Sequence, residues 1–398
     1  MTTSSRPKRL TVLGSTGSVG RQTLEVVARY PERFVVVGLA AGKNVELLAA
    51  QIARFHPVAV SVADEPSAVE LRARLGSVKR PEIFVGEAGA IQIARADADV
   101  VMAAMVGAAG LSPTLAAVEA GRDVALANKE VLVMAGELVT KTAARTGARL
   151  LPVDSEHCAI HQALAGRPAE QVTRLVLTAS GGPLLDTPLV DFASITPARA
   201  VKHPRWDMGA KISIDSSTLL NKGFEVLEAK WLFDIPESRI GIVVHPEAII
   251  HSMVDFIDGS TIAQLGIPDM AVPIGYALAW PDRLPGLVRH CDLAKLGSLT
   301  FREPDHARFP AVGLAYEAAR LGGTSPAMLV AADDVAVDAF LKGAIDFPSI
   351  TRLLAEVLAA EPSRPLVSLE DVREAERVAR AATERRIASG IDPRRALA

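Results

Sequence analysis

Cysteine is scarce in this chain, which has only Cys158 and Cys291 among its 398 residues. Two cysteines without CxxC spacing support neither the disulfide framework of a secreted protein nor a thiolate metal site. A large net charge is also lacking, because 43 Lys and Arg stand against 46 Asp and Glu. Without a broad cationic surface, the chain is not expected to bind nucleic acid or an anionic membrane. A reducing cytoplasm is the compartment that fits best.

Long apolar runs are missing as well. The basic N-terminal segment is followed only by the short apolar run 10–13, far below the length of a signal-peptide core, so we expect no secretion signal. The longest uncharged stretch, 100–118, is rich in alanine and interrupted by glycines and Pro113. We therefore interpret it as a buried strand, loop and helix rather than a membrane span.

The alternation of apolar and amphipathic segments predicts an α/β protein with several domains. Residues 1–150 predict an N-terminal Rossmann-like domain, a doubly wound parallel sheet of the kind that binds nucleotides. Residues 151–290 mix strands with loops rich in Pro, Ser and Gly and predict a central α+β catalytic domain with a flexible lid loop. A linker over 291–305 leads to a C-terminal α-helical domain over 306–398.

Local patterns place individual elements within these regions. Ser325-Pro326 has the pattern of a helix start, Ser368 begins a predicted capping box, and the last helix is expected to end near Gly390. The strands expected in the first region are 10–13, 34–39, 58–62, 99–102 and 124–126, and those in the second are 174–178, 241–244 and 260–265.

A glycine-rich turn follows the first predicted strand. Gly14, Gly17 and Gly20 precede an amphipathic segment, 21–30. This is the context in which a pyrophosphate binds to the amides at a helix N-terminus. Because the spacing is GxxGxxG rather than GxGxxG, a tight turn that binds nothing stays open as an alternative.

The end of the second predicted strand distinguishes NADPH from NADH. An acidic residue there would bind the ribose 2′-hydroxyl of NADH and repel a 2′-phosphate. Instead, the strand runs into Gly42, Lys43 and Asn44, whose amides and ammonium suit a phosphate. The sequence therefore favours NADPH, although Lys43 and Asn44 in a solvated loop, with Asn44 capping the next helix, are an alternative.

Two acids, Asp154 and Glu156, follow an apolar run at 149–153. In an extended chain, side chains at i and i+2 point to the same side, so both carboxylates would converge on one cation. Carboxylates are ligands that Mg²⁺ and Mn²⁺ prefer. The rival interpretation is zinc at His157 and His161, which would share one helix face.

A third carboxylate, Glu225, lies on a predicted helix with an apolar stripe. The Asp-Ser-Ser-Thr cluster at 215–218 has the pattern of the start of this helix. Asn221 and Lys222 lie about one turn before Glu225, so phosphate donors would stand beside an acid. A surface ion pair between Lys222 and Glu225 is the alternative.

Three further segments place polar groups in loops. Residues 127–130 follow a predicted strand, where doubly wound sheets bind ligands, although a Lys-Glu neighbour pair is also an ordinary surface feature. Residues 180–183 form a glycine turn with a hydroxyl, which suits an oxyanion. The long segment 197–209 contains Trp206 and is interpreted as a lid, with a packed surface loop as the alternative.

Together and in order, these motifs closely resemble the 1-deoxy-D-xylulose 5-phosphate reductoisomerase family. With the helical tail, they cover essentially the whole chain. The resemblance implies an enzyme that uses NADPH and a divalent cation. It would isomerise 1-deoxy-D-xylulose 5-phosphate and reduce the product to 2-C-methyl-D-erythritol 4-phosphate, in the non-mevalonate isoprenoid pathway. The matching segments are 14–20, 42–44, 127–130, 154–157, 179–183, 203–209 and 221–225.

Carried over by position, the resemblance implies a role for each site residue. The cation, Mn²⁺, Mg²⁺ or Co²⁺, would bind Asp154, Glu156 and Glu225. The phosphate would bind Ser180, Ser216, Asn221 and Lys222. The sugar would contact Lys129, Ser155 and His203, with Trp206 covering it. The NADPH residues would be Thr16, Gly17, Ser18, Val19, Gly42, Lys43, Asn44, Asn128, Glu130 and Gly209.

The catalytic residues among these would be Lys129, Asp154, Glu156, His203 and Glu225. Arg205 and Asp207 depart from the family pattern in the predicted lid, which bears on lid dynamics rather than on the reaction. The resemblance also implies a homodimer, with residues 245–251 and the β-like runs after them as a sheet edge.

Two other classes of protein were weighed against this enzyme. A phosphorylating semialdehyde dehydrogenase also begins with an NADP-binding region, but it needs a cysteine nucleophile. Neither Cys158 nor Cys291 has an evident activating neighbourhood. A non-catalytic NADPH sensor would explain only the first 130 residues and would leave the three acids unused. The favoured reading is an oxidoreductase with a small sugar phosphate as substrate.

Overall fold

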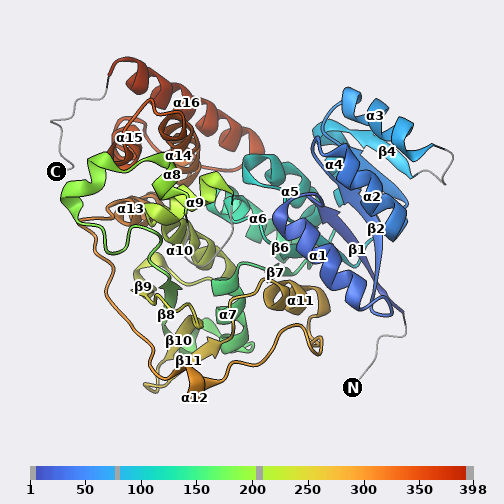
Figure 1. The fold of residues 1–398 in the computed structure, drawn as a ribbon, viewed down its shortest axis with the longest axis horizontal. Helices are drawn as coiled ribbons and strands as arrows, with labels where there is room; N and C mark the ends of the chain where they lie inside the picture. Colours follow the sequence, from blue (N-terminus) through green and yellow to red (C-terminus); the bar gives the residue numbers. More distant parts are fainter. Residues whose placement is uncertain (1–5, 77–80, 203–208, 391–398) are drawn as a thin grey trace. The chain divides into compact units, whose positions relative to one another are not determined.

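The computed structural model describes residues 6–76, 81–202 and 209–390 (Figure 1). The contacts within the described chain divide it into two units. The first unit comprises the chain up to Val131, Val139–Cys158 and Asp269–Arg289. The second comprises Leu132–Leu138, Ala159–Pro268 and the chain from His290 onward. The domain boundaries that the sequence indicates near 150, 290 and 305 stay predictions.

A seven-stranded sheet of parallel strands lies at the centre of the first unit. Its strand order is β4-β3-β2-β1-β5-β6-β7, so the winding reverses between β1 and β5. Doubly wound sheets bind ligands at the carboxyl edge of such a switch point. The predicted Rossmann-like sheet is thus confirmed. The strands are β1 (Lys8–Leu13), β2 (Phe34–Ala40), β3 (Ala59–Val62), β4 (Glu82–Val85), β5 (Val100–Ala103), β6 (Asp123–Leu126) and β7 (Leu150–Pro152).

Helices connect these strands, and those over 18–29, 45–55 and 65–75 bury apolar side chains in a shared core with the sheet. One helix of this core comes from much later in the chain, since α11 (Ala271–Ala279) contacts α1, β6 and β7. Lys8 of β1 fixes the end of α11, because its Nζ donates to the Leu278 and Trp280 carbonyl oxygens at 3.1 and 2.7 Å. The other helices are α1 (Ser18–Arg29), α2 (Val45–Phe55), α3 (Glu65–Leu75), α4 (Gly86–Ala94), α5 (Leu111–Glu119), and parts of α6 (Glu130–Thr146) and α7 (Ser155–Leu164).

A four-stranded sheet in the order β11-β10-β8-β9 organises the second unit. The strand β10 is antiparallel to both neighbours, whereas β8 and β9 are parallel. Alternate residues of β10 are buried, so one face of the sheet packs on the core and the other is partly open. The strands are β8 (Val172–Ala179), β9 (Ile240–Val244), β10 (Ile250–Phe256) and β11 (Thr261–Leu265).

Helices make up the rest of the second unit, and three long ones gather at its C-terminal end (Figure 1). The predicted C-terminal helical region is confirmed. The predicted capping box is present, since Ser368 and Asp371 exchange hydrogen bonds at the start of α16. These helices are α8 (Pro197–Ala200), α9 (Ala210–Ser217), α10 (Leu220–Phe233), α12 (Leu293–Leu296), α13 (Ala311–Leu321), α14 (Ser325–Leu341), α15 (Phe347–Ala360) and α16 (Leu369–Ala388).

Four short 3₁₀ helices complete the described elements, and they are Gly107–Gly110, Ala169–Gln171, Leu189–Ser194 and Glu237–Arg239. The stretch 100–118 forms the predicted strand, loop and helix. Within the described ranges, no helix combines the length and the apolar character that a membrane crossing requires.

Candidate functional site

The glycine turn after β1 leads into α1, as predicted. Gly14 has φ of +84°, and a Cβ at Gly20 would lie 2.2 Å from the Gly14 carbonyl oxygen, so both positions require glycine. Two hydrogen bonds to Gln51 of α2 fix the turn. Ser15 Oγ donates to Gln51 Oε1, and Gln51 Nε2 donates to the Ser15 carbonyl oxygen, both at 2.8 Å. Gly17 caps α1 without a side-chain hydrogen bond. The turn therefore offers open amides at a helix N-terminus beside the switch point.

The loop after β2 takes the form that the sequence left as an alternative. Asn44 caps α2 by accepting a hydrogen bond from the Leu47 amide at 3.1 Å. Lys43 is largely exposed, and its Nζ lies 3.5 Å from Asp64 Oδ2. Hydrogen bonds from Ser67 hold the pKa of Asp64 below its usual value. Asn44 thus caps α2, and the Lys43 ammonium lies at the surface. The NADPH role of both residues stays a prediction.

The segment after β6 is more enclosed than a surface Lys-Glu pair would be. Asn128 is buried and donates from Nδ2 to the Met105 and Gly107 carbonyl oxygens at 2.5 and 3.0 Å. Lys129 is buried too, and its Nζ lies 2.9 Å from Asp154 Oδ2. Two candidate residues from separate strand ends, Lys129 and Asp154, are thus brought together at the carboxyl edge of the first sheet.

The prediction that Asp154 and Glu156 lie in an extended chain is wrong, because α7 begins at Ser155. The Asp154 carbonyl oxygen accepts the first helical hydrogen bond, from the Cys158 amide at 2.8 Å. Glu156 therefore lies in the first turn of a helix, where Ser155 Oγ donates to its Oε2 at 2.6 Å. The two carboxylates are positioned by a strand end and a helix start rather than by a shared strand face.

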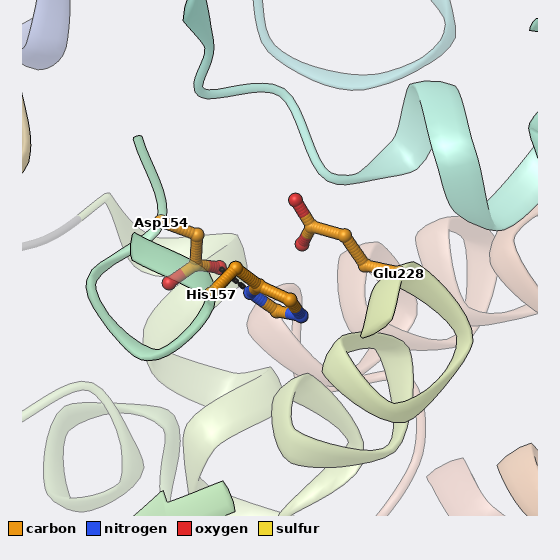
Figure 2. Close-up of side chains that lie close together, drawn as sticks. All are labelled: Asp154, His157 and Glu228. Carbon is orange, nitrogen blue, oxygen red and sulfur yellow. Dashed lines mark ion pairs between the residues drawn. The ribbon is translucent and has the colours of Figure 1, made fainter. Parts of the chain in front are cut away.

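His157 lies beside Asp154 in the first turns of α7. Figure 2 shows the ion pair, in which His157 Nδ1 is 3.9 Å from Asp154 Oδ2, and it also draws Glu228 of α10. Burial lowers the pKa of His161, which lies one turn after His157. A zinc site needs at least three ligands, and among the described residues no three-ligand cluster includes His161. The zinc interpretation therefore gains no support.

In the second unit, a glycine in the turn after β8 packs closely against Ser216 at the end of α9. Gly182, with φ of +67°, follows Ser180 after β8. A Cβ at Gly182 would lie 2.6 Å from the Ser216 carbonyl oxygen and 3.4 Å from Ser216 Oγ. Only glycine allows this approach, so the turn that follows Ser180 lies against Ser216, and both serines are predicted to bind phosphate.

The helix that carries Ser216 differs from the predicted one. Residues 215–218 lie at the end of α9 rather than at the start of α10, so that prediction is wrong. The reason is local, because Ser217 Oγ donates to the Ser213 carbonyl oxygen inside the helix instead of capping a new one. α10 begins only after Leu219, which adopts φ of +59°.

The helix α10 buries its predicted apolar stripe and holds its polar residues in place. Asn221 Nδ2 donates to Glu225 Oε1 at 2.5 Å, and Lys222 Nζ donates to Glu225 Oε2. The Lys222 and Glu225 side chains are only 5% and 2% exposed. The alternative of a surface ion pair is therefore wrong in one respect, because the pair is buried. A buried carboxylate with two donors is a strongly positioned group.

Four residues named from the sequence are not among those that the structure describes, and one buried acid was missed. His203 and Trp206, with the departures Arg205 and Asp207, lie outside the described residues, and Gly209 caps α9. Glu228 was not singled out from the sequence, although it is buried one turn after Glu225. Its spacing of i+3 from a candidate ligand was the available signal.

Three family models match the chain. The model described as 1-deoxy-D-xylulose 5-phosphate reductoisomerase matches residues 10–136. The model of the 1-deoxy-D-xylulose 5-phosphate reductoisomerase C-terminal domain matches residues 150–233. The model of the DXP reductoisomerase C-terminal domain matches residues 265–382. The matched segments together span most of both units.

Individual proteins resemble the chain over nearly its whole length. The 1-deoxy-D-xylulose 5-phosphate reductoisomerase of Chlorobium chlorochromatii (strain CaD3) is 53% identical over 94% of this chain and 98% of its own. That of Anaeromyxobacter dehalogenans (strain 2CP-1 / ATCC BAA-258) is 53% identical over 96% and 97%.

Solved structures agree with these relatives. The Zymomonas mobilis reductoisomerase in complex with NADPH has a TM-score of 0.92 and 42% identity, covering 96% of this chain and all of the other. A DOX-P reductoisomerase in complex with NADPH, fosmidomycin and magnesium has a TM-score of 0.89 and 39% identity, covering 96% and 98%.

Proposed function

The chain belongs to the 1-deoxy-D-xylulose 5-phosphate reductoisomerase family, and on that premise we propose the reaction that it catalyses. It is an NADPH-dependent oxidoreductase that needs a divalent cation. It isomerises 1-deoxy-D-xylulose 5-phosphate and reduces the product to 2-C-methyl-D-erythritol 4-phosphate in isoprenoid synthesis. The observation that carries this conclusion is the match to relatives over more than nine tenths of both chains.

For the cation, the donor set fits a hard metal ion. We propose that Asp154 and Glu156 of the first unit and Glu225 of the second hold it, because carboxylate oxygens suit Mg²⁺, Mn²⁺ and, less selectively, Co²⁺. Ammonium groups accompany two of these acids, Lys129 beside Asp154 and Lys222 beside Glu225. An ammonium next to a carboxylate favours its charged form, which is the form that binds a cation.

For the phosphate, we propose a site built from Ser180, Ser216, Asn221 and Lys222. The close approach of Gly182 to Ser216 supports it, since the turn that follows Ser180 packs against the end of α9 that carries Ser216. Lys222 is largely withdrawn from water, and a desolvated ammonium binds an anion more strongly than an exposed one. Binding energy from the phosphate is available to orient the reacting end of the substrate.

For the reacting end, NADPH supplies the hydride and the cation supplies Lewis-acid charge. Lys129 would donate from Nζ to a sugar oxygen, with Asp154 holding it in place at 2.9 Å. Ser155 lies at the start of α7, where its hydroxyl fixes Glu156 and would also contact the sugar. The sugar contacts of His203 and Trp206 stay predictions.

For NADPH, we propose that the turn after β1 binds the pyrophosphate through open amides at the start of α1. The loop after β2 would receive the 2′-phosphate, because no acidic residue stands at its Gly42, Lys43 and Asn44. The remaining proposed contacts are Thr16, Gly17, Ser18, Val19, Asn128, Glu130 and Gly209.

The assay of this function follows NADPH absorbance after addition of 1-deoxy-D-xylulose 5-phosphate with Mn²⁺ or Mg²⁺. We expect consumption that EDTA abolishes and that NADH supports poorly, because the site is proposed to need both the cation and the 2′-phosphate. No consumption by folded, NADPH-binding protein would contradict the substrate assignment.

A semialdehyde dehydrogenase is not favoured. That reaction requires an accessible thiolate nucleophile. Cys158 is buried on α7, and the family relatives catalyse a different reaction by name. We therefore expect that Cys158 is not a nucleophile in the reaction and that its replacement by serine does not remove one.

We further propose a cytoplasmic homodimer that associates through the second unit. The strand β11 lies at the edge of its sheet, and the apolar side chains of Ile262 and Leu265 on it are 37% and 38% exposed. Unpaired edges with apolar side chains are surfaces on which sheets associate. The strand β11 is one of the β-like runs after residues 245–251 that the sequence indicated for a sheet edge.

Lysine at both Ile262 and Leu265 is expected to shift the protein toward the monomer, because two charges would face the partner edge. Light scattering after gel filtration measures this against the monomer mass of 42.0 kDa. Val190→Lys is the matched control, since Val190 is an exposed apolar residue of the same unit that lies in a 3₁₀ helix rather than on a strand of the sheet. A wild-type mass at the monomer value would refute the dimer.

A further inference from the structure

Three charged side chains inside the second unit are not used by the proposed chemistry. Lys211 and Asp215 lie one turn apart on α9, and Asp333 lies on α14. Lys211 Nζ is 2.7 Å from Asp215 Oδ2 and 2.8 Å from Asp333 Oδ2. The Asp215 and Asp333 side chains are 4% and 0% exposed, and Lys211 is 28% exposed. One ammonium thus faces two buried carboxylates.

Within the part of the chain that the structure describes, the neighbouring charges do not supply a second cation to this pair. Asp334 Oδ1 lies 3.7 Å from Lys211 Nζ, but Arg380 of α16 donates to Asp334 Oδ2 at 2.6 Å. Glu376 lies 3.9 Å from Arg380 on the same helix. From α10, the Phe224 ring faces Lys211 Nζ at 5.2 Å. Arg380 therefore balances Asp334, and Lys211 has two buried acids to balance.

Among the described residues, only one of the four carboxylate oxygens of the pair accepts a well-directed hydrogen bond, and it is Asp215 Oδ2, which accepts from Lys211 Nζ. Asp215 Oδ1 and both Asp333 oxygens are buried, and no described residue gives them a hydrogen bond of good geometry. The contact from Lys211 to Asp333 Oδ2 is thus an ion pair without a well-directed hydrogen bond. A buried ionised oxygen without a donor is costly, and a proton removes the charge while supplying a donor.

The electrostatic environment agrees with a bound proton. Burial and the adjacent Asp333 charge raise the pKa of Asp215 well above its ordinary value. Burial likewise raises the pKa of Asp333, against the opposing effect of Lys211. Because Asp215 Oδ2 and Asp333 Oδ2 both contact Lys211 Nζ, the two carboxyl groups are close enough to titrate as one pair.

This cluster also lies next to the proposed phosphate site. Ser216 directly follows Asp215 in the last turn of α9, and it is the residue that Gly182 approaches. Asp333 ties that turn to α14 through Lys211. A change in the charge of the pair would therefore act on the position of Ser216.

We propose that Asp215 and Asp333 share one proton beside Lys211, and that this cluster positions Ser216 for the phosphate of the substrate. The protonated carboxyl donates its O–H to the other carboxylate, and the Lys211 ammonium balances the remaining negative charge. Lys211, Asp215 and Asp333 are then positioning residues. Their proposed effect on substrate binding rests on the proposed role of Ser216, whereas the shared proton does not.

The first test counts protons released on unfolding, with wild type compared with Asp333→Asn. The folded pair holds one proton at pH 7 that ordinary aspartates lose in the unfolded chain, so unfolding in urea releases one proton. The amide of D333N donates to Asp215 instead, and this release disappears. Since the folded state binds more protons, wild-type stability falls as pH rises from about 4 toward the raised pKa values of the pair. The urea midpoint of D333N is therefore expected to exceed that of wild type increasingly from about pH 5 to about pH 8.

Asp334→Asn is the matched control, because it makes the same change one residue along α14. Asp334 is partly exposed and paired with Arg380, so D334N is expected to release as many protons as wild type. If D333N also releases as many protons as wild type, or has the lower urea midpoint at about pH 8, both carboxylates are ionised and the shared proton is refuted.

The second test separates positioning from folding. Lys211→Met removes the ammonium and is expected to raise the KM for 1-deoxy-D-xylulose 5-phosphate about tenfold, with kcat and the KM for NADPH within about twofold. Lys211→Arg is expected to restore the substrate KM, because it keeps the charge. A simple loss of folded protein would lower the apparent kcat and leave KM unchanged. Positioning by charge is refuted if soluble K211M has an unchanged KM for 1-deoxy-D-xylulose 5-phosphate. It is also refuted if soluble K211R, the milder change, has a raised one.

Ser216→Ala distinguishes this proposal from the function on which part of it rests. If S216A leaves the substrate KM unchanged, Ser216 does not bind the phosphate, and both its assignment and the positioning effect fail. The proton count of D333N against D334N still decides the shared proton in that case.

Discussion

Glutamine in place of Glu225 is expected to lower kcat/KM by at least about a thousandfold, because a cation ligand contributes several kcal/mol to the transition state. The change keeps the size of the side chain and the donors around it, since Asn221 Nδ2 and Lys222 Nζ both contact this carboxylate. Binding of NADPH is expected to stay within about twofold, because the proposed NADPH contacts lie in other segments. Absorbance assays over a range of Mn²⁺ concentrations, with fluorescence titration of NADPH, measure the two effects separately.

Glu228→Gln provides the comparison for this result. Glu228 is also buried on α10, one turn later, so E228Q makes the same chemical change in a similar environment. We expect it to retain metal-dependent turnover within about tenfold. If E225Q keeps wild-type activity, or if E228Q rather than E225Q loses its response to Mn²⁺, the assignment of Glu225 as the ligand is wrong.

Methionine in place of Lys222 is expected to lower kcat/KM for the sugar phosphate by about 10- to 100-fold. A hydrogen bond to a charged group is worth about 1.5–3 kcal/mol, and Lys222→Met removes the proposed one to the phosphate. Because the substitution also removes the buried ammonium that pairs with Glu225, we expect a lower midpoint of thermal unfolding. Steady-state kinetics with the substrate and thermal unfolding of the same sample measure both effects.

Lys230→Met is the matched control, since it makes the same change further along α10. Lys230 pairs with Glu237 at 2.8 Å and donates to the Ala319 carbonyl oxygen at 2.7 Å, contacts that belong to helix packing. K230M is expected to affect stability without raising the substrate KM. An equal rise in KM for K230M and K222M would show that the effect comes from the helix rather than from the phosphate.

Periodicity was enough to predict most of both sheets. Strands such as β2 and β5 are almost continuous apolar runs, because both of their faces are buried. The strand β4 was missed because it is short, begins with Glu82 and lies at the edge of the first sheet, where its side chains are only partly buried. An edge strand of four residues has too little apolar patterning to be recognised.

The turn between α9 and α10 could not be predicted from residue types. Asp and Ser near 215–218 usually cap helices, but here Asp215 accepts a hydrogen bond within α9, and Ser217 donates within α9 and to α8. Leu219 adopts a positive φ that leucine rarely takes, so its sequence gives no signal for the break.

For the candidate site, the residue types were predictable but their neighbours were not. Acids, lysines and serines in loops indicated a cation and a phosphate. The contact of Lys129 with Asp154 and the approach of Gly182 to Ser216 join segments that are more than twenty residues apart. Such pairings depend on strand order and helix packing, which a single sequence does not specify.

The late position of α11 affects how the first unit is completed during synthesis. Every strand of its sheet has been translated by Pro152, yet the helix that covers part of its core ends only at Ala279. A ribosome adding about 5–20 residues per second therefore leaves this core uncovered for several seconds. During that interval the nascent chain exposes apolar surface that a chaperone would recognise. The order of the segments along the chain therefore exposes this surface during synthesis, whereas the finished fold buries it.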